Sequence, residues 1–186
     1  MNDFFAGLDV STQGQKIVVI DLQKNSVIYS DSINYDLDLP KYSTLNGVIR
    51  DTETGVSESN PKMWIDALHL IFERLKTSSD IIQSIKAISI AGQQHGLVAI
   101  DIDGNLAKPT SKLWNDFSTL EECEILTKEI GGSEHMIHAV ANSQRTGYTA
   151  SKIFHMYRNE RELYEKTDYF LLVHNYINCL LYTSPS

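Results

Sequence analysis

The chain has little of what marks several common classes of protein. Its 186 residues contain two cysteines, Cys123 and Cys179, whose separation matches no metal-binding or redox motif, and this suits a reducing compartment. No apolar run approaches the roughly 20 residues that span a bilayer. The N-terminus lacks a basic segment followed by an apolar stretch and a cleavage site. We therefore expect a cytoplasmic protein without a membrane partner.

Positive charge is also scarce. The chain has 16 basic and 24 acidic residues, which gives a net charge of -8, and no basic cluster could follow a phosphate backbone. We therefore expect no nucleic-acid partner. The length corresponds to about one domain, so the chain is a single domain or a part of a larger protein.

The first half of the chain is predicted to begin with strands. Residues 4–9, 16–22 and 27–33 are rich in β-forming residues and are separated by turn-forming residues, which indicates a three-stranded antiparallel start. Residues 36–60 show no periodicity and are predicted to form a long loop, of a length that is often functional. Asn60 and Pro61 then form a cap and a first turn for a helix to about residue 76.

The second half alternates between strands and helices. Residues 85–90 are predicted to form a strand buried on both faces, and residues 97–100 a second strand. Ser118 and Glu121 have the spacing of a capping box, which would begin a helix that ends at Gly131 and Gly132. Further helices are predicted over 149–157 and 160–165, and a strand over 169–173. This pattern predicts an α/β fold with a mixed sheet and flanking helices.

A polar turn follows the first predicted strand. Asp9 stands where that strand ends, and Ser11, Thr12, Gln13 and Gly14 come after it. Such a turn can direct backbone N–H groups and a hydroxyl at phosphate oxygens, while the carboxylate binds Mg²⁺, usually through water. The alternative is an ordinary hairpin turn, in which the same residues serve only turn geometry.

A second polar segment, Gln93-Gln94-His95, lies between two predicted strands and is flanked by Gly92 and Gly96. Amide donors, amide acceptors and an imidazole together can bind several hydroxyl groups, and the glycines let a ligand approach the backbone. The alternative is a polar turn whose groups bond one another, since an unpaired buried polar group costs about 1–3 kcal/mol.

Three further residues could contact a polyhydroxylated ligand. Trp114 could offer an aromatic face, but a tryptophan is usually a core residue, and we expect Trp114 in the core. The Asp116 carboxylate could accept hydrogen bonds from hydroxyls. Arg145 could donate a rigid pair of hydrogen bonds, although an isolated arginine more often forms a surface ion pair.

With these residues in view, the chain resembles the FGGY carbohydrate kinases, and within that family the xylulokinase branch. The resemblance covers about residues 4–180. Its most specific segment is 91–96, and 7–13 is similar to the first phosphate motif of the family, with Ser11 where many members have glycine. The segments 114–119 and 147–152 also match, although His155 occupies a position where tryptophan is usual.

The resemblance implies a two-domain, actin-like (ribonuclease-H-like) ATPase fold, of which residues 1–180 are part of the first domain and 36–60 an excursion. It implies ATP and Mg²⁺, with Asp9 on the metal and Ser11, Thr12 and Gln13 beside the phosphates. It places His95 and Arg145 at a ketose, with Gln94 adjacent and Asp116 a weaker candidate. The expected substrate is D-xylulose, which would give D-xylulose 5-phosphate, and a homodimer is possible.

The resemblance also implies what these residues lack. The general base of the family, a later carboxylate, and most nucleotide contacts cannot be placed in 186 residues, so a truncated first domain, inactive by itself, is expected. Residues 181–186 resemble translated sequencing-adapter DNA and are of doubtful origin. Ribulose, gluconate or glycerol are alternative substrates. A non-catalytic sugar-binding module is the alternative from another class.

Overall fold

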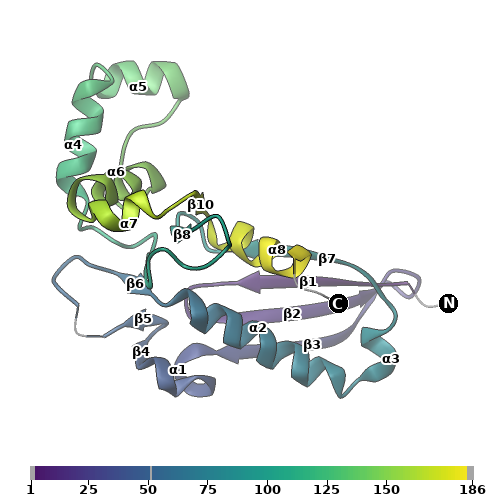
Figure 1. The fold of residues 1–186 in the computed structure, drawn as a ribbon. Coiled ribbons are helices and arrows are strands. Elements are labelled where there is room, and N and C mark those ends of the chain that lie inside the picture. The colour runs from purple at the N-terminus through teal and green to yellow at the C-terminus, as the bar shows by residue number, and fades with distance from the viewer. Residues whose placement is uncertain (1–2, 51, 184–186) are drawn as a thin grey trace. The chain divides into compact units, whose positions relative to one another are not determined.

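The computed structural model describes residues 3–50 and 52–183, and these form two compact units. The first unit contains the described parts of 1–50, 60–93 and 174–186, and the second contains those of 51–59 and 94–173. Helices and strands alternate along the chain, so the predicted α/β class is confirmed (Figure 1).

The first unit is built on a four-stranded sheet in the order β3-β2-β1-β7. Strands β1 (Phe4–Val10), β2 (Gly14–Asp21) and β3 (Ser26–Asn34) are antiparallel, which confirms the predicted three-stranded start. Strand β7 (Ile85–Gly92) runs parallel to β1 (Figure 1). Alternate residues of β1 are buried, and Asp9 lies on the opposite, exposed face of that strand.

Helix α2 (Pro61–Lys76) covers one face of this sheet and packs on β2 and β3. Its predicted bounds are confirmed, because the Asn60 side chain accepts a hydrogen bond from the backbone N–H of Lys62 and Pro61 occupies the first turn. The Gln15 amide donates to the Trp64 carbonyl at 2.6 Å. The fully or almost fully buried side chains of the helix include Trp64, Leu68, Ile71 and Leu75. Each contributes about 1.5–3 kcal/mol to folding.

Two further helices of the first unit, α3 (Ser79–Ile82) and α8 (Val173–Thr183), are shorter than α2. Helix α3 follows α2 directly, and helix α8 begins against the end of β7. A Cβ added at Gly92 would lie 3.2 Å from the backbone nitrogen of His174. A side chain at this position would therefore require the start of α8 to shift by a few tenths of an ångström. The prediction for the tail over 181–186 lies in part outside the described residues.

The prediction of a loop over 36–60 is wrong in part, because short elements occupy it. These are α1 (Tyr35–Asp38), a 3₁₀ helix (Pro40–Tyr42), β4 (Thr44–Leu45), β5 (Val48–Ile49) and β6 (Glu58–Ser59). The Asp36 carboxylate holds several of them together, since it accepts hydrogen bonds from Thr44 Oγ1 and from the backbone N–H groups of Asn46 and Gly47. Elements of two to four residues are too short to produce a periodic sequence pattern.

Strand β7 is not buried on both faces as predicted. Ala87, Ser89 and Ala91 are exposed, and their apolar neighbours on the other face are only half-buried. In the described part of the chain β7 pairs with β1 alone, so it is the edge strand of this sheet. The sequence of β7 is therefore more apolar than its partial burial among the described residues would require.

Among its described residues, the second unit contains two small sheets and four helices. Strand β8 (Val98–Ile100) pairs with β10 (Tyr169–Leu171), and β6 pairs with β9 (Ser111–Lys112). The helices are α4 (Leu120–Glu129), α5 (Ser133–Val140), α6 (Thr149–Asn159) and α7 (Arg161–Glu165). The strands and helices predicted for this region are present, with bounds that shift by a few residues.

The predicted capping box at Ser118 is wrong. Helix α4 begins after Thr119, whose side chain makes no capping hydrogen bond, while the Ser118 hydroxyl donates to the Asp116 carboxylate at 2.6 Å. The Ser118 hydroxyl therefore bonds the buried Asp116 carboxylate and does not cap helix α4.

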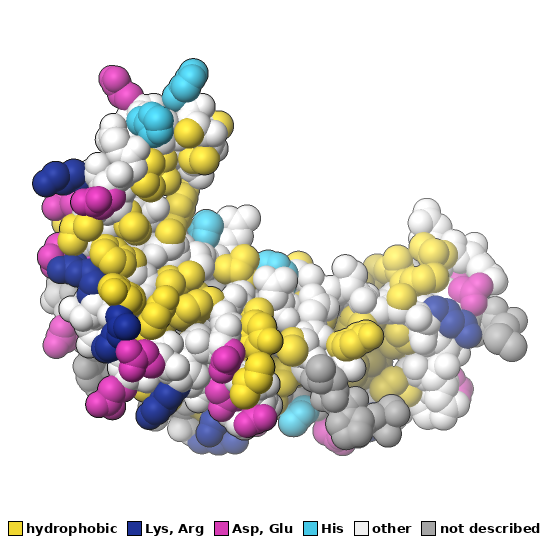
Figure 2. Space-filling model, turned by 45° about the horizontal axis from the view of Figure 1, so that its top comes forward, with side chains coloured by type: hydrophobic (Ala, Val, Ile, Leu, Met, Phe, Trp, Pro, Cys, Tyr) yellow, Lys and Arg dark blue, Asp and Glu magenta, His cyan; other side chains and the backbone are white. Residues whose placement is uncertain are grey.

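Hydrophobic side chains remain on the surface of both units (Figure 2). No helix among the described residues has the length and apolar character needed to cross a membrane.

Candidate functional site

The first group of predicted site residues surrounds the turn between β1 and β2. The Ser11 hydroxyl donates to the Asp9 carboxylate, and the Ser11 backbone N–H donates to the Gly14 carbonyl at 2.9 Å, which closes the turn. Asp9 and Gln13 are exposed, and Ser11 and Thr12 are half-buried. The predicted phosphate residues therefore lie together on one accessible turn.

Two residues outside the turn, Tyr35 and Gly47, fix its backbone. The Tyr35 backbone N–H donates to the Gln13 carbonyl at 3.1 Å, and the Tyr35 hydroxyl donates to the Ser11 carbonyl at 3.3 Å. Tyr35 is fully buried, and burial raises the pKa of its hydroxyl far above the usual range. Gly47 has φ of 77°, and a Cβ there would lie 1.9 Å from the Thr12 carbonyl oxygen. The turn is thus fixed by contacts that only a glycine at this position permits.

Lys16 belongs to the same site, although no sequence motif marks it. The antiparallel register of β1 and β2 places Lys16 directly opposite Asp9, so both side chains share the exposed face of the sheet. With Asp9, Ser11 and Gln13 it lines an open hollow of about 320 Å³. The alternation of apolar and polar residues in β2 could have predicted which face of the sheet Lys16 lies on. Only the strand register shows that Lys16 lies opposite Asp9.

The donor set of this turn fits a hydrated magnesium ion beside phosphate. A carboxylate, hydroxyls and an amide supply the oxygen atoms that Mg²⁺ prefers, and the lysine supplies positive charge for an anion. One carboxylate is enough for such an ion, because Mg²⁺ keeps several waters and binds phosphate oxygens. Asp9 would hold it.

Gln93 connects the turn to the second polar segment. Its side-chain oxygen accepts a hydrogen bond from the Thr12 hydroxyl at 3.3 Å, and its backbone N–H donates to the Val10 carbonyl at 2.9 Å. Gln93 is 9% exposed, and its Nε2 has no hydrogen-bond partner among the described residues. The boundary between the two units falls directly after it.

His95 belongs to the second unit and is half-buried, while the neighbouring Gln94 is exposed. The imidazole stacks on the Tyr148 ring, with centroids 4.4 Å apart, and the His95 carbonyl accepts a hydrogen bond from Lys152. Burial, and then the charge of Lys152, lower the pKa of the imidazole. The lowered pKa favours the neutral ring, which presents one donor and one acceptor nitrogen and so suits hydroxyl groups.

Asp116 is fully buried, which does not fit the predicted contact with a sugar. Its carboxylate accepts hydrogen bonds from the Ser57 backbone N–H at 2.9 Å and from the Ser118 hydroxyl, and Lys112 Nζ lies 3.4 Å away. These groups already occupy the oxygen atoms that a sugar hydroxyl would need. We propose instead that Asp116 orders the loop around it.

Substitution of Asp116 with Asn should therefore reduce stability rather than sugar binding. The variant leaves Lys112 without this counter-charge and presents an amide to N–H donors, so we expect a loss of about 3 kcal/mol in the free energy of unfolding. Urea unfolding measures this loss, with Asp103→Asn on an exposed turn as the control. A stable Asp116→Asn variant with weakened sugar binding would restore the original assignment.

Trp114 and Arg145 are both exposed. Trp114 is 53% exposed, so the expectation of a core tryptophan is wrong. Arg145 Nε donates to Ser143 Oγ at 3.4 Å. A Cβ added at Gly147 would lie 2.0 Å from the Trp114 carbonyl oxygen, so the loops that carry the tryptophan and the arginine are in close contact. An aromatic face and a guanidinium are thus accessible in one part of the second unit.

Comparison with known proteins decides the family. Residues 4–184 match the model described as the FGGY family of carbohydrate kinases, N-terminal domain. The chain belongs to the FGGY family of carbohydrate kinases. A xylulose kinase of Schizosaccharomyces pombe is 37% identical over 196 residues, which cover 95% of this chain and 34% of that protein. The predicted family is confirmed.

Solved structures of FGGY kinases share the fold. A xylulose kinase from Rhodospirillum rubrum has a TM-score of 0.79 at 21% identity, covering 95% of this chain and 33% of that chain. A gluconate kinase from Lactobacillus acidophilus has a TM-score of 0.76 at 21% identity, covering 95% and 32%. The predicted fold class is therefore confirmed. The chain spans about a third of the length of the curated relatives that it matches.

Proposed function

We propose that this chain is the N-terminal part of a kinase that transfers the γ-phosphate of ATP to D-xylulose and gives D-xylulose 5-phosphate. The observation that carries the proposal is the 37% identity to a xylulose kinase over 95% of the chain. Two features support it: the accessible turn at Asp9 suits magnesium and phosphate, and the half-buried imidazole of His95 suits sugar hydroxyls.

The turn of the first unit would serve the nucleotide. We assign Asp9 to magnesium, and Ser11, Thr12, Gln13 and Lys16 to the phosphates, because these residues line or border one hollow of mixed charge. Magnesium, when bound, neutralises phosphate charge during transfer. The fixed backbone of the turn would spare the protein the entropy of ordering these groups when the nucleotide binds.

Exposed and half-buried residues of the second unit would bind the ketose. We assign hydroxyl contacts to Gln94, His95 and Arg145, and a contact with the C–H surface of the sugar to Trp114. Phosphoryl transfer depends mainly on positioning and electrostatic stabilisation, so these contacts would act by holding one hydroxyl in line. The role of general base is assigned to none of these residues. We also propose a cytoplasmic location, because the cytoplasm would supply the ATP.

A panel of substrates tests the sugar. We expect the complete kinase to give a kcat/KM for D-xylulose at least about tenfold above those for D-ribulose, D-gluconate and glycerol, because one hydroxyl-binding contact more or less has an effect of this size. ADP release measures the rates. A gluconate kinase shares the fold, so gluconate is one of the competitors. A preference for gluconate would overturn D-xylulose as the substrate and leave the assignment as a kinase intact.

A further inference from the structure

Helix α6 contacts His95 at two different points. Its N-cap residue, Tyr148, stacks its ring on the imidazole. One turn further along, Lys152 donates a hydrogen bond from Nζ to the His95 carbonyl oxygen. The start of one helix thus contacts both the side chain and the backbone of the same residue.

The backbone of His95 requires such support. Its φ is 59°, in the left-handed region, which a residue with a Cβ adopts at a cost in free energy. Such a conformation persists where surrounding contacts determine it, and these contacts are often found at functional sites. The glycine that follows His95 adds no side chain to hold the segment.

Lys152 is unusual because its buried ammonium group bonds a carbonyl oxygen. It is 1% exposed, and among the described residues it forms no ion pair with a carboxylate, although Asp116 attracts it and Lys112 repels it. Burial lowers the pKa of its ammonium to about 8. A buried lysine is rare without a carboxylate partner. The hydrogen bond to the His95 carbonyl is therefore the contact that accounts for the buried position of Lys152.

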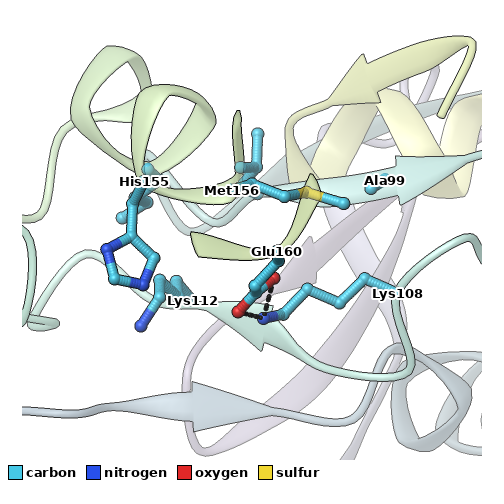
Figure 3. Close-up of a pocket in the computed structure, with 8 residues that line it drawn as sticks. Ala99, Lys108, Lys112, His155, Met156 and Glu160 are labelled. Carbon is cyan, nitrogen blue, oxygen red and sulfur yellow. Dashed lines mark hydrogen bonds and ion pairs between the residues drawn. The ribbon is translucent and has the colours of Figure 1, made fainter. Parts of the chain in front are cut away.

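A half-buried lysine nearby, Lys108, shows the ordinary arrangement. Lys108 and Lys152 both line a small cavity of about 10 Å³, enough for one water molecule (Figure 3). Lys108 Nζ lies 2.7 Å from one oxygen of Glu160 and 3.6 Å from Glu58, so its charge is neutralised directly. Lys108 thus provides a control for the loss of an ammonium that lines the same cavity.

We infer that Lys152 and Tyr148 are positioning residues for His95, and that they set the affinity of the kinase for its sugar through that residue. The inference rests on the proposed function. It assigns the segment from Gly147 to Lys152 to sugar binding. It also predicts that substitution of Tyr148 or Lys152 has no effect on the affinity for the sugar once the His95 side chain is absent.

The test compares Lys152→Met with Lys108→Met in the complete kinase. Lys152→Met should raise the KM for D-xylulose by about tenfold, since a displacement of a binding group by a fraction of an ångström has effects of this order, and leave the KM for ATP unchanged. Lys108→Met should leave the KM for D-xylulose unchanged. In a His95→Ala background, Lys152→Met should cause no further increase.

Two results would overturn the inference. One is an equal rise of both Michaelis constants in Lys152→Met, and the other is an increase that adds fully to that of His95→Ala. If circular dichroism shows that Lys152→Met does not fold, Tyr148→Ala and Tyr148→Phe decide, because Phe keeps the stacked ring and only Ala should raise the KM for the sugar. A wild-type kinase that phosphorylates no ketose would instead refute the proposed function.

Discussion

Replacement of His95 with Ala should raise the KM of the complete kinase for D-xylulose by roughly 10- to 100-fold, because the variant loses one or two hydrogen bonds to hydroxyl groups. The KM for ATP should stay within about twofold, since His95 lies outside the turn that we assign to the phosphates. Initial rates at varied sugar and fixed ATP, and the reverse, measure both constants.

The matched control is His135→Ala, which removes an exposed imidazole from α5 in the same unit. It should change neither constant. If His95→Ala raised both Michaelis constants to the same extent, the imidazole would serve the fold of the kinase in general, and its assignment to the sugar would be wrong.

Replacement of Asp9 with Asn should act on turnover instead. Asparagine can still accept the hydrogen bond from Ser11, so the turn should keep its shape, but the negative charge that we assign to magnesium is lost. We expect kcat to fall by about 10²- to 10³-fold, comparable to the loss of one preorganised electrostatic contact. The Mg²⁺ concentration for half-maximal rate should rise.

An exposed aspartate of the same unit, Asp80 in α3, provides the control for this charge change. Asp80→Asn should leave both kcat and the magnesium requirement as in the wild type. An Asp9→Asn variant with the same turnover and the same magnesium requirement would show that Asp9 is only a turn residue.

The sequence predicts this fold where a local signal agrees with burial. Helix α2 has its predicted bounds because the cap at Asn60, the proline after it and the apolar face all specify the same element. Prediction failed at Ser118, whose hydroxyl bonds the buried Asp116 carboxylate, and at Trp114, which is exposed. Both outcomes depend on contacts made after the chain folds, which a local pattern does not contain.

The candidate site shows the same division. Asp9 and His95 stand out in the sequence because polar residues and glycines interrupt apolar strands. Lys16 and Lys152 do not stand out, because lysine is common and its role depends on what lies opposite. The register of β1 with β2 gives Lys16 its place beside Asp9, and the packing of α6 gives Lys152 its carbonyl partner.

The most direct test of the account is to incubate the complete protein with ATP, Mg²⁺ and D-xylulose, and to measure ADP formation and the mass of the sugar product together. We predict ADP formation that depends on the sugar, with a sugar monophosphate in equal amount. Binding of D-xylulose without any ADP would contradict the kinase assignment and favour a sugar-binding module.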